Sequence, residues 1–273
     1  MLEAILNGGF STYLTAFALG SARLMMFAVI APFMGNAALN MTVRSALVLA
    51  LYLVIHPVVF EAVEALGPME GAGLVRFVVL VLKEVFIGFI LGWLSGMIFW
   101  AVEGAGFFID NQRGAGQATE TDPLTGDQSS PTGSFLFQSL TYAFFASGAF
   151  TAFLGLVYGT YVIWPVDALL PSAFFEMEGA ALFFGKCLAT LALNIVLVSA
   201  PVVLACLFTD MALGLINRFA SQLNVYVLAM PIKSALASFL LILYFAVLMT
   251  DAPERFTLFG IDLKMLQNFM RMP

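Results

Sequence analysis

This sequence is short of charge. Lys, Arg, Asp and Glu together make up 10% of its 273 residues, whereas 62% are hydrophobic. A soluble domain usually carries about 25% charged residues, so the scarcity excludes an ordinary soluble protein and predicts an integral membrane protein. The net charge is −6, and Lys and Arg form no cluster. Nucleic acid is therefore not an expected partner, whereas membrane lipid is.

Histidine and cysteine are also scarce, which removes several kinds of catalytic and metal site. His56 is the single histidine, so the H-E-x-x-H helix of zinc proteases cannot be built. Cys187 and Cys206 lie in one apolar run, where buried thiols are expected rather than a metal pair. A Ser147–His56 pair is conceivable, but no glycine-flanked nucleophile motif surrounds Ser147. No nucleotide-binding G-x-x-x-x-G-K-[ST] motif occurs either, so we expect no enzymatic activity, metal or cofactor.

Long apolar runs are what the sequence has in abundance. A helix needs about 20 apolar residues to cross a bilayer core, and most of the runs reach that length. The runs are Phe10–Met34, Val43–Phe60, Leu74–Val102, Phe135–Tyr158, Ala180–Phe208 and Val225–Met249. Asn40 and Ser134 are expected helix starts before the second and fourth runs. Pro201 and Pro231 predict kinks or breaks in the last two, and the fold class is all-α with broken or kinked helices.

A few ionisable residues interrupt the apolar runs. Each costs at least about 2.5–3.5 kcal/mol in hydrocarbon, and Arg76 and Lys186 can reach a membrane surface from near a helix end. Lys83 and Glu84 are adjacent and point in different directions on a helix, so we expect them not to neutralise each other. We interpret a set of charges as contacts to other helices, in this chain or in another subunit. The set is Arg23, Lys83, Glu84, Lys186 and Lys233.

Three glycines recur every four residues in the third run, at Gly88, Gly92 and Gly96. This spacing places small residues on one face of a helix, where a second backbone can approach closely. Chance recurrence among 23 glycines is the alternative, but three glycines in register favour close helix packing.

The most polar stretch of the chain is Glu103–Ser134, between the third and fourth runs. It also contains the apolar residues Phe107–Ile109, for which a solvated linker has little use. Burial in a conduit is therefore one interpretation, and a disordered cytosolic loop is the other. Asp110 and Arg113 are spaced i, i+3, so they either form a local pair that ends the helix or shape a loop that lines the conduit.

This stretch resembles a known family. GFFIDNQRG at residues 106–114 and DPLTGDQSSP at residues 122–131 are similar to the T subunit of the type III secretion export apparatus. That is the SctT family (SpaR/YscT/HrcT-like), related to flagellar FliR. A second match, QLNVYVLAMPIK, lies at residues 222–233, and the order of apolar runs agrees over essentially the whole chain.

The resemblance implies a single export-gate subunit over residues 1–273, in the bacterial inner membrane within the secretion-system base. Its implied partners are R- and S-type subunits, the large export-gate and switch subunits, and unfolded secreted proteins as cargo. Residues 103–134 would contain a plug that seals the protein-conducting pore. The implied plug residues are Phe107, Phe108, Ile109, Asp110, Gln112, Arg113, Gly114, Asp122, Pro123 and Leu124.

Other interpretations stay open at this point. Broken helices and intramembrane charges also suit a stand-alone secondary transporter or channel for a small solute. An intramembrane protease would rest on Ser147 and His56 alone. Residues 252–273 form a C-terminal tail, which is either a short amphipathic helix that begins at Asp262 or a frayed end.

Overall fold

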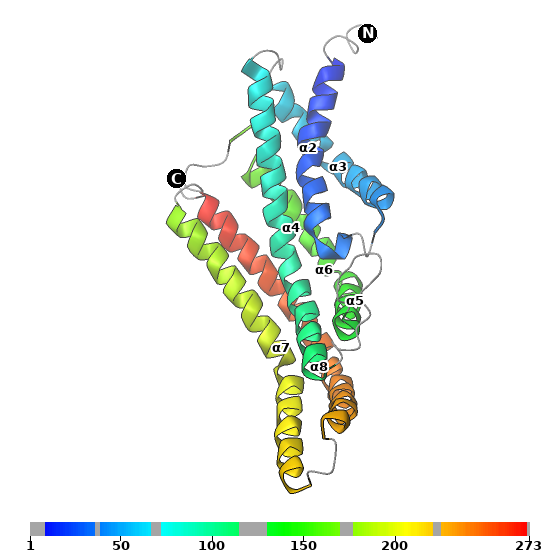
Figure 1. Cartoon of the computed structure of the whole chain (residues 1–273). Coiled ribbons are helices and arrows are strands. Elements are labelled where there is room, and N and C mark those ends of the chain that lie inside the picture. Colours follow the sequence, from blue (N-terminus) through cyan, green and yellow to red (C-terminus); the bar gives the residue numbers. More distant parts are fainter. Residues whose placement is uncertain are drawn as a thin grey trace. The chain divides into compact units, whose positions relative to one another are not determined.

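The computed structural model describes residues 9–35, 39–66, 72–114, 130–169, 177–220 and 225–271. Every regular element in these ranges is helical, which confirms the expected all-α class (Figure 1). The elements are α2 (Phe10–Ile30), the 3-10 helix η2 (Pro32–Met34), α3 (Met41–Glu64), α4 (Ala72–Gln112), α5 (Pro131–Ala146), α6 (Ala149–Ile163), α7 (Met177–Phe219) and α8 (Val225–Arg271).

Two helix starts show how local chemistry sets the boundaries. Asn40 is the N-cap of α3, as expected, because its side chain accepts a 2.8 Å hydrogen bond from the Val43 amide. The expected start at Ser134 is wrong. Ser130 is the N-cap of α5, its Oγ accepting a 2.9 Å bond from the Gly133 amide. Pro131 then occupies the first helical position, where its missing N–H costs nothing.

The fourth apolar run is not one helix. α5 and α6 meet at a bend of 76°, and Gly148 between them has φ of +74°. That value lies in the left-handed region, which side chains disfavour and glycine accepts, so the chain turns here.

Of the predicted kinks or breaks at proline, no break occurs, because Pro201 and Pro231 both lie within continuous helix. Figure 1 shows that α7 bends part-way along. α8 likewise continues without interruption to Arg271. Asp262 is therefore an interior residue of α8 and does not begin a separate helix.

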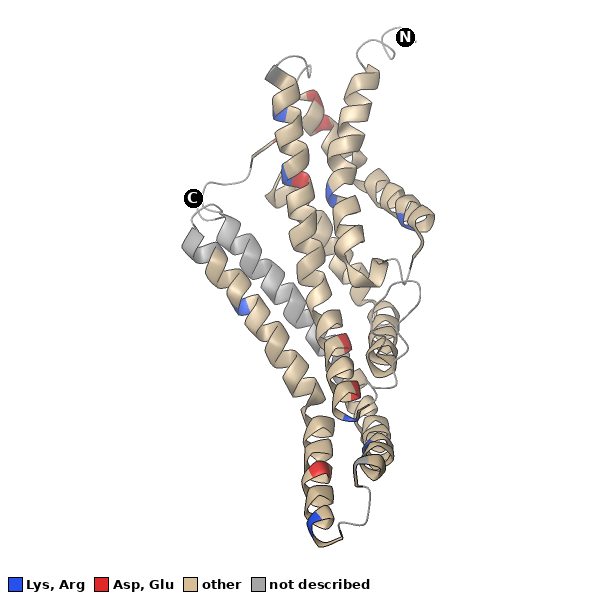
Figure 2. Ribbon diagram, viewed as in Figure 1, with Lys and Arg blue, Asp and Glu red and all other residues tan. Residues whose placement is uncertain are grey.

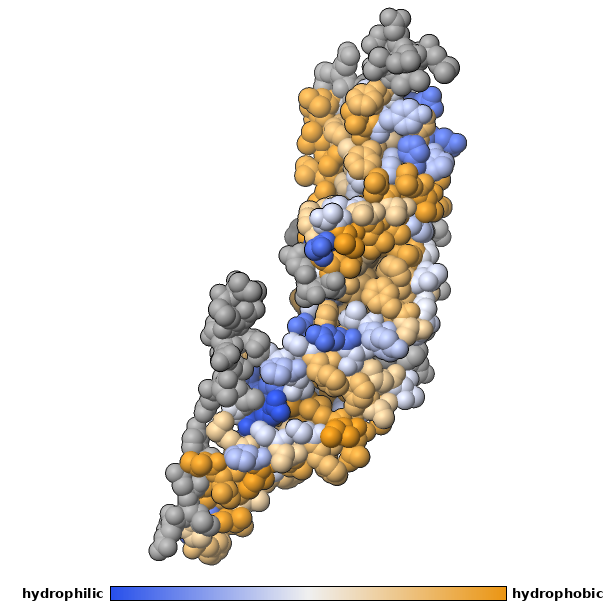
Figure 3. All heavy atoms as spheres, turned by 90° about the vertical axis from the view of Figure 1, so that its right-hand side faces the viewer, coloured by the Kyte–Doolittle hydropathy of each residue, from blue (hydrophilic) through white to orange (hydrophobic). Residues whose placement is uncertain are grey.

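The helices give a multi-pass membrane protein. Among the described residues, α2, α3, Ala181–Phe219 of α7 and Val227–Thr250 of α8 are long and apolar enough to cross a membrane. The bent pair α5–α6 adds a fifth crossing if it spans as one. Charges are sparse along these helices (Figure 2), and apolar side chains cover much of the face seen in Figure 3.

The chain divides into two compact units. The first contains residues 1–96, 150–181 and 258–273, and the second contains 97–149 and 182–257. In the first unit, Phe27, Phe33 and Phe153 pack their rings together with centroids 5.4–6.2 Å apart. In the second unit, the core holds Ile109, Val202, Cys206 and Ala237. Both Cys206 and Cys187 are buried, as expected.

Candidate functional site

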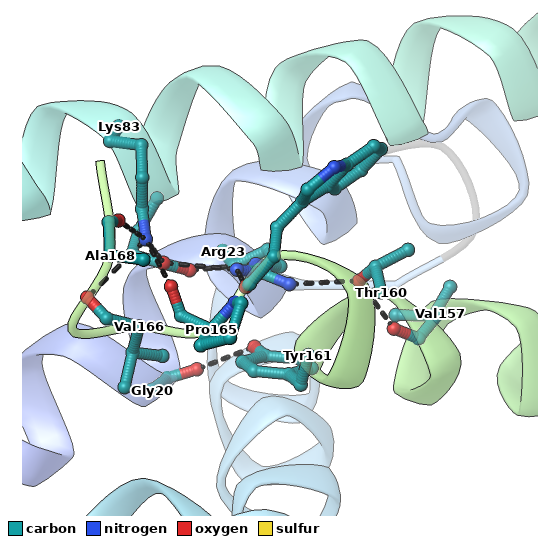
Figure 4. A network of polar contacts seen from close by, with 11 residues as sticks. Gly20, Arg23, Lys83, Val157, Thr160, Tyr161, Pro165, Val166 and Ala168 are labelled. Atoms are coloured by element: carbon teal, nitrogen blue, oxygen red, sulfur yellow. Dashed lines mark hydrogen bonds and ion pairs between the residues drawn. The ribbon is translucent and has the colours of Figure 1, made fainter. Parts of the chain in front are cut away.

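A buried ion pair joins α2 to α4 in the first unit. Arg23 places Nε 2.7 Å from one oxygen of Glu84 and donates a second bond of 2.9 Å to the other oxygen. Both side chains are 0% exposed. Arg23 also donates to Thr160 Oγ1 at 2.9 Å and to the Trp164 carbonyl at 2.8 Å, and it lies 4.0 Å from the Tyr161 ring centroid (Figure 4). A buried pair needs such additional bonds to offset its desolvation.

Lys83 completes this cluster. Its Nζ lies 2.7 Å from Glu84 Oε1, so the expectation that these neighbours would not pair is wrong. The flexible stem of lysine carries the ammonium back to a carboxylate that already faces Arg23. The ammonium also donates to main-chain carbonyls in the turn after α6, at 2.7–3.3 Å (Figure 4). These carbonyls belong to Pro165, Val166 and Ala168.

The ammonium of Lys83 is buried, and α4 is not among the membrane-crossing candidates. Burial lowers the pKa of Lys83 below its ordinary value, while the nearby Glu84 carboxylate opposes that shift. The cluster therefore contains two cationic side chains around one carboxylate, with carbonyl dipoles supplying the remaining negative potential.

The glycine stripe of α4 lies against α2. A Cβ at Gly88 would overlap the carbonyl oxygen of Arg23, and one at Gly92 would lie 2.7 Å from Ile30 Cβ. Gly96, one turn further along, is buried. The backbones of α2 and α4 approach closely at these glycines, which brings Glu84 within reach of Arg23.

A second buried carboxylate joins α4 to α5 in the second unit. Asp110 accepts bonds from Ser130 Oγ at 2.7 Å, from the Thr132 amide at 3.0 Å and from Thr132 Oγ1 at 2.6 Å. Arg113 forms an ion pair with it at 2.8 Å. We call these four residues the Asp110 clasp. It ties the last turn of α4 to the first turn of α5, on either side of residues 115–129, which lie outside the described part of the chain.

Close backbone contact supports the clasp. A Cβ at Gly106 would overlap the backbone of Gly133, and a Cβ at Gly133 would lie 2.8 Å from the Glu103 carbonyl oxygen. No side chain separates α4 from α5 at this crossing. The two helices therefore converge at the point where Asp110 bonds to Ser130 and Thr132.

Comparison with known proteins places this architecture in a family. The model of the family described as "Bacterial export proteins, family 1" matches residues 14–258, which is most of the chain. The chain belongs to this family.

Individual relatives agree with that membership. The chain is 37% identical over 233 residues to the Yop proteins translocation protein T of Yersinia pestis, covering 85% of this chain and 86% of the relative. It is 28% identical over 235 residues to the surface presentation of antigens protein SpaR of Salmonella typhimurium, covering 86% and 84%. It is 32% identical over 183 residues to the flagellar biosynthetic protein FliR of Bacillus subtilis, covering 67% and 70%.

This family member is therefore a component of a type III secretion or flagellar export apparatus, a multi-subunit complex, and a multi-pass protein of the inner membrane. None of the names of these relatives describes an enzyme. The residues considered for protease chemistry have other partners. His56 Nδ1 lies 2.7 Å from the Tyr52 hydroxyl, and Ser147 Oγ donates to the Phe144 carbonyl. The described residues contain no group of His, Cys, Asp or Glu arranged to hold a metal.

The structure separates the residues that were expected to form the plug. Phe107 and Phe108 are helical and 42–43% exposed, whereas Ile109 is buried in the core of the second unit. Gly114, just after α4, has φ of +83°. Three of the expected plug residues lie outside the described residues, namely Asp122, Pro123 and Leu124.

The remaining interpreted charges lie in the second unit. Lys186 is exposed on α7. Lys233 on α8 pairs with Asp210 on α7 and donates to the carbonyl of Gln112 at the end of α4.

Several partners were not singled out from the sequence, among them Thr160, Trp164, Thr132 and Asp210. One local signal was available for the clasp. Ser130-Pro131 carries the N-cap and first-turn pattern of a helix start, which would have moved the boundary from Ser134. Thr160 and Asp210 lie on helices distant in sequence from their partners, so no local pattern marks them.

We expect Asp110→Ala to open the clasp. The substitution removes a buried acceptor of three hydrogen bonds and one ion pair, and bonds to a charged group contribute about 1.5–3 kcal/mol each. Trypsin should then cut after Arg113 faster in the purified export complex, by roughly tenfold if about 1.4 kcal/mol is lost. Asp110→Asn keeps one acceptor oxygen, so its cleavage rate should lie between those of the parent and Asp110→Ala. Glu103→Gln removes an exposed carboxylate from the same helix, and trypsin should cut this variant at the parent rate. If Asp110→Ala is also cut at the parent rate, Asp110 does not hold the clasp closed.

Proposed function

We propose that this family member is a non-enzymatic subunit of the export gate, that it forms part of the protein-conducting pore, and that it contributes the plug that seals it. The plug lies within residues 103–134, at about Phe107–Leu124. The Asp110 clasp is the observation that carries this proposal, because it fastens the chain on both sides of residues 115–129 with buried, charge-assisted bonds.

A fastened base limits how far the segment can reach. A segment fastened at both ends can move aside from a pore and still stay attached close to it. The end of α4 supplies exposed apolar rings at Phe107 and Phe108, which suit contacts inside a conduit.

Exposed apolar surface supports assembly with other membrane subunits. Only 11% of the membrane-crossing stretch of α8 is buried within this chain, and 22% of that of α7. Such surface fits lipid or the helices of partner subunits. We propose R- and S-type subunits as these partners, with the large export-gate and switch subunits beyond them and unfolded secreted proteins as cargo. Because the sequence has no nucleotide-binding motif, energy for transport would come from other components.

Deletion of Gly114–Gly126 tests the plug. We expect the assembled gate to leak ions or small solutes, because the seal is removed while the clasp residues remain. Solute entry into cells or liposomes that contain the assembled gate measures the leak. A variant in which a Gly/Ser segment of equal length replaces Gly114–Gly126 is the matched control for chain connectivity. The gate with this variant should leak less than the gate with the deletion if the bulk of the segment contributes to the seal. A deletion variant that assembles normally and stays impermeable would show that the plug lies elsewhere.

A further inference from the structure

The last turn of α4 receives a hydrogen bond from another helix. The final carbonyls of any helix lack partners within the helix and carry partial negative charge. In the second unit, Lys233 of α8 donates from Nζ to the Gln112 carbonyl at 3.1 Å. α4 has no basic residue in its own last turn, so Lys233 supplies from outside the cation that commonly stabilises a helix C-terminus.

The same ammonium is held by α7. Lys233 Nζ lies 3.0 Å and 3.2 Å from the two carboxylate oxygens of Asp210. One side chain thus connects α7, α8 and the end of α4. The Lys233 side chain is 13% exposed and that of Asp210 is 38% exposed, so this chain alone does not enclose the pair. This differs from the Arg23–Glu84 pair, where both side chains are 0% exposed.

Apolar contacts surround this connection. Ile109, on the preceding turn of α4, packs with Val202 and Cys206 of α7 and with Ala237 of α8. The position that a Cβ would occupy at Gly114 lies 3.4 Å from Met230 of α8. The end of α4 is therefore fastened on one side by the Asp110 clasp and on another side by α7 and α8.

We propose that Lys233 is a positioning residue that couples α7 and α8 to the last turn of α4, and so controls how firmly the base of the plug is held. This inference rests on the proposed function for its consequence in the assembled gate. The coupling is adjustable because a part-exposed ion pair is weaker than a fully buried one. A shift of α7 against α8 that separates Asp210 from Lys233 would release the Gln112 carbonyl without disturbing the Asp110 clasp.

Amide hydrogen exchange in the purified export complex tests the coupling directly. The amides of Arg113 and Gly114 bond to the Ile109 and Asn111 carbonyls, and their exchange reports on the last turn of α4. Lys233→Met removes the ammonium and keeps the length of the side chain. We expect exchange at these two amides to rise by roughly two- to fivefold, the range for a part-exposed ion pair. Lys233→Arg, which keeps charge and donors, should restore parent exchange.

A second variant separates coupling from a general loss of packing, because it weakens the ion pair and leaves the Lys233 side chain in place. Asp210→Asn should lie between the parent and Lys233→Met, and it remains usable if the methionine variant assembles poorly. Arg218→Met, at an exposed arginine near the end of α7, should behave as the parent.

The solute-leak assay then connects the coupling to function. We expect Lys233→Met to leak more than the parent gate and Lys233→Arg not to leak. If the Gly114–Gly126 deletion leaks and Lys233→Met does not, the coupling is overturned while the plug stands. If the deletion does not leak, the plug is overturned, and the exchange data still decide whether Lys233 holds α4. Unchanged exchange in Lys233→Met overturns the coupling whatever the leak.

Discussion

Replacing Glu84 with glutamine is expected to destabilise this protein strongly. The change leaves the guanidinium of Arg23 and the ammonium of Lys83 buried together without their shared carboxylate. Removing one partner of a buried ion pair typically costs about 3–5 kcal/mol. The purified export complex should lose this chain at a lower temperature, and its level in the membrane should fall.

Two further variants make the Glu84→Gln result interpretable. Arg76→Gln removes an exposed charge from the same helix and should leave the melting temperature unchanged. Arg23→Met combined with Glu84→Gln leaves Lys83 as the one cation of this cluster. The double variant should therefore recover part of the stability that Glu84→Gln loses. The free energy of an ordinary exposed ion pair is about 1 kcal/mol. If Glu84→Gln lowers the free energy of unfolding by no more than this, water reaches the cluster and the buried-charge argument fails.

Gly88→Ala is expected to be the second large effect. The added Cβ would overlap the Arg23 carbonyl oxygen, which is backbone and cannot rotate away. Overpacking of this kind costs about 1–3 kcal/mol, and here it would also shift the residue that bonds to Glu84. Thermal unfolding of the purified complex in detergent measures the loss.

Gly155→Ala is the matched control, because nothing lies within 4 Å of the corresponding Cβ position on α6. Alanine in an open helical position stabilises by about 0.5–1 kcal/mol relative to glycine. The two substitutions should therefore have opposite signs. A Gly88→Ala variant as stable as Gly155→Ala would mean that α2 and α4 separate at no cost, and that the glycine contact is not required.

The helices were predictable because their length and apolar composition follow from the membrane alone. The predicted N-cap at Asn40 was also correct, since capping depends on a few adjacent residues. The bend at Ser147-Gly148 was missed although Ser-Gly is a dipeptide typical of turns, because the apolar run around it is long enough to form one membrane-crossing helix. Proline was a partial guide. Pro201 predicted a kink or break, and α7 continues through it with a bend part-way along (Figure 1).

Pairing of charges was harder to predict than helix position. Adjacent residues on a helix point apart, which is why Lys83 and Glu84 were not expected to pair. The pair forms because Glu84 is drawn toward Arg23 on another helix, and the lysine stem is long enough to follow. One contact of the clasp could be predicted. The i, i+3 spacing of Asp110 and Arg113 gave a local pair as one interpretation, and this pair forms. The stronger bonds of Asp110 to Thr132 depend on how α4 crosses α5.

Lys83 has one more consequence, for the conditions under which the chain can fold. Its ammonium lies among three main-chain carbonyl oxygens and one carboxylate oxygen, a set of ligands that would also suit a dissolved potassium or sodium ion. Here the cation is covalently attached to α4. The turn after α6 therefore needs no ion from the cytoplasm or the periplasm, and its formation is independent of the salt composition on either side of the membrane.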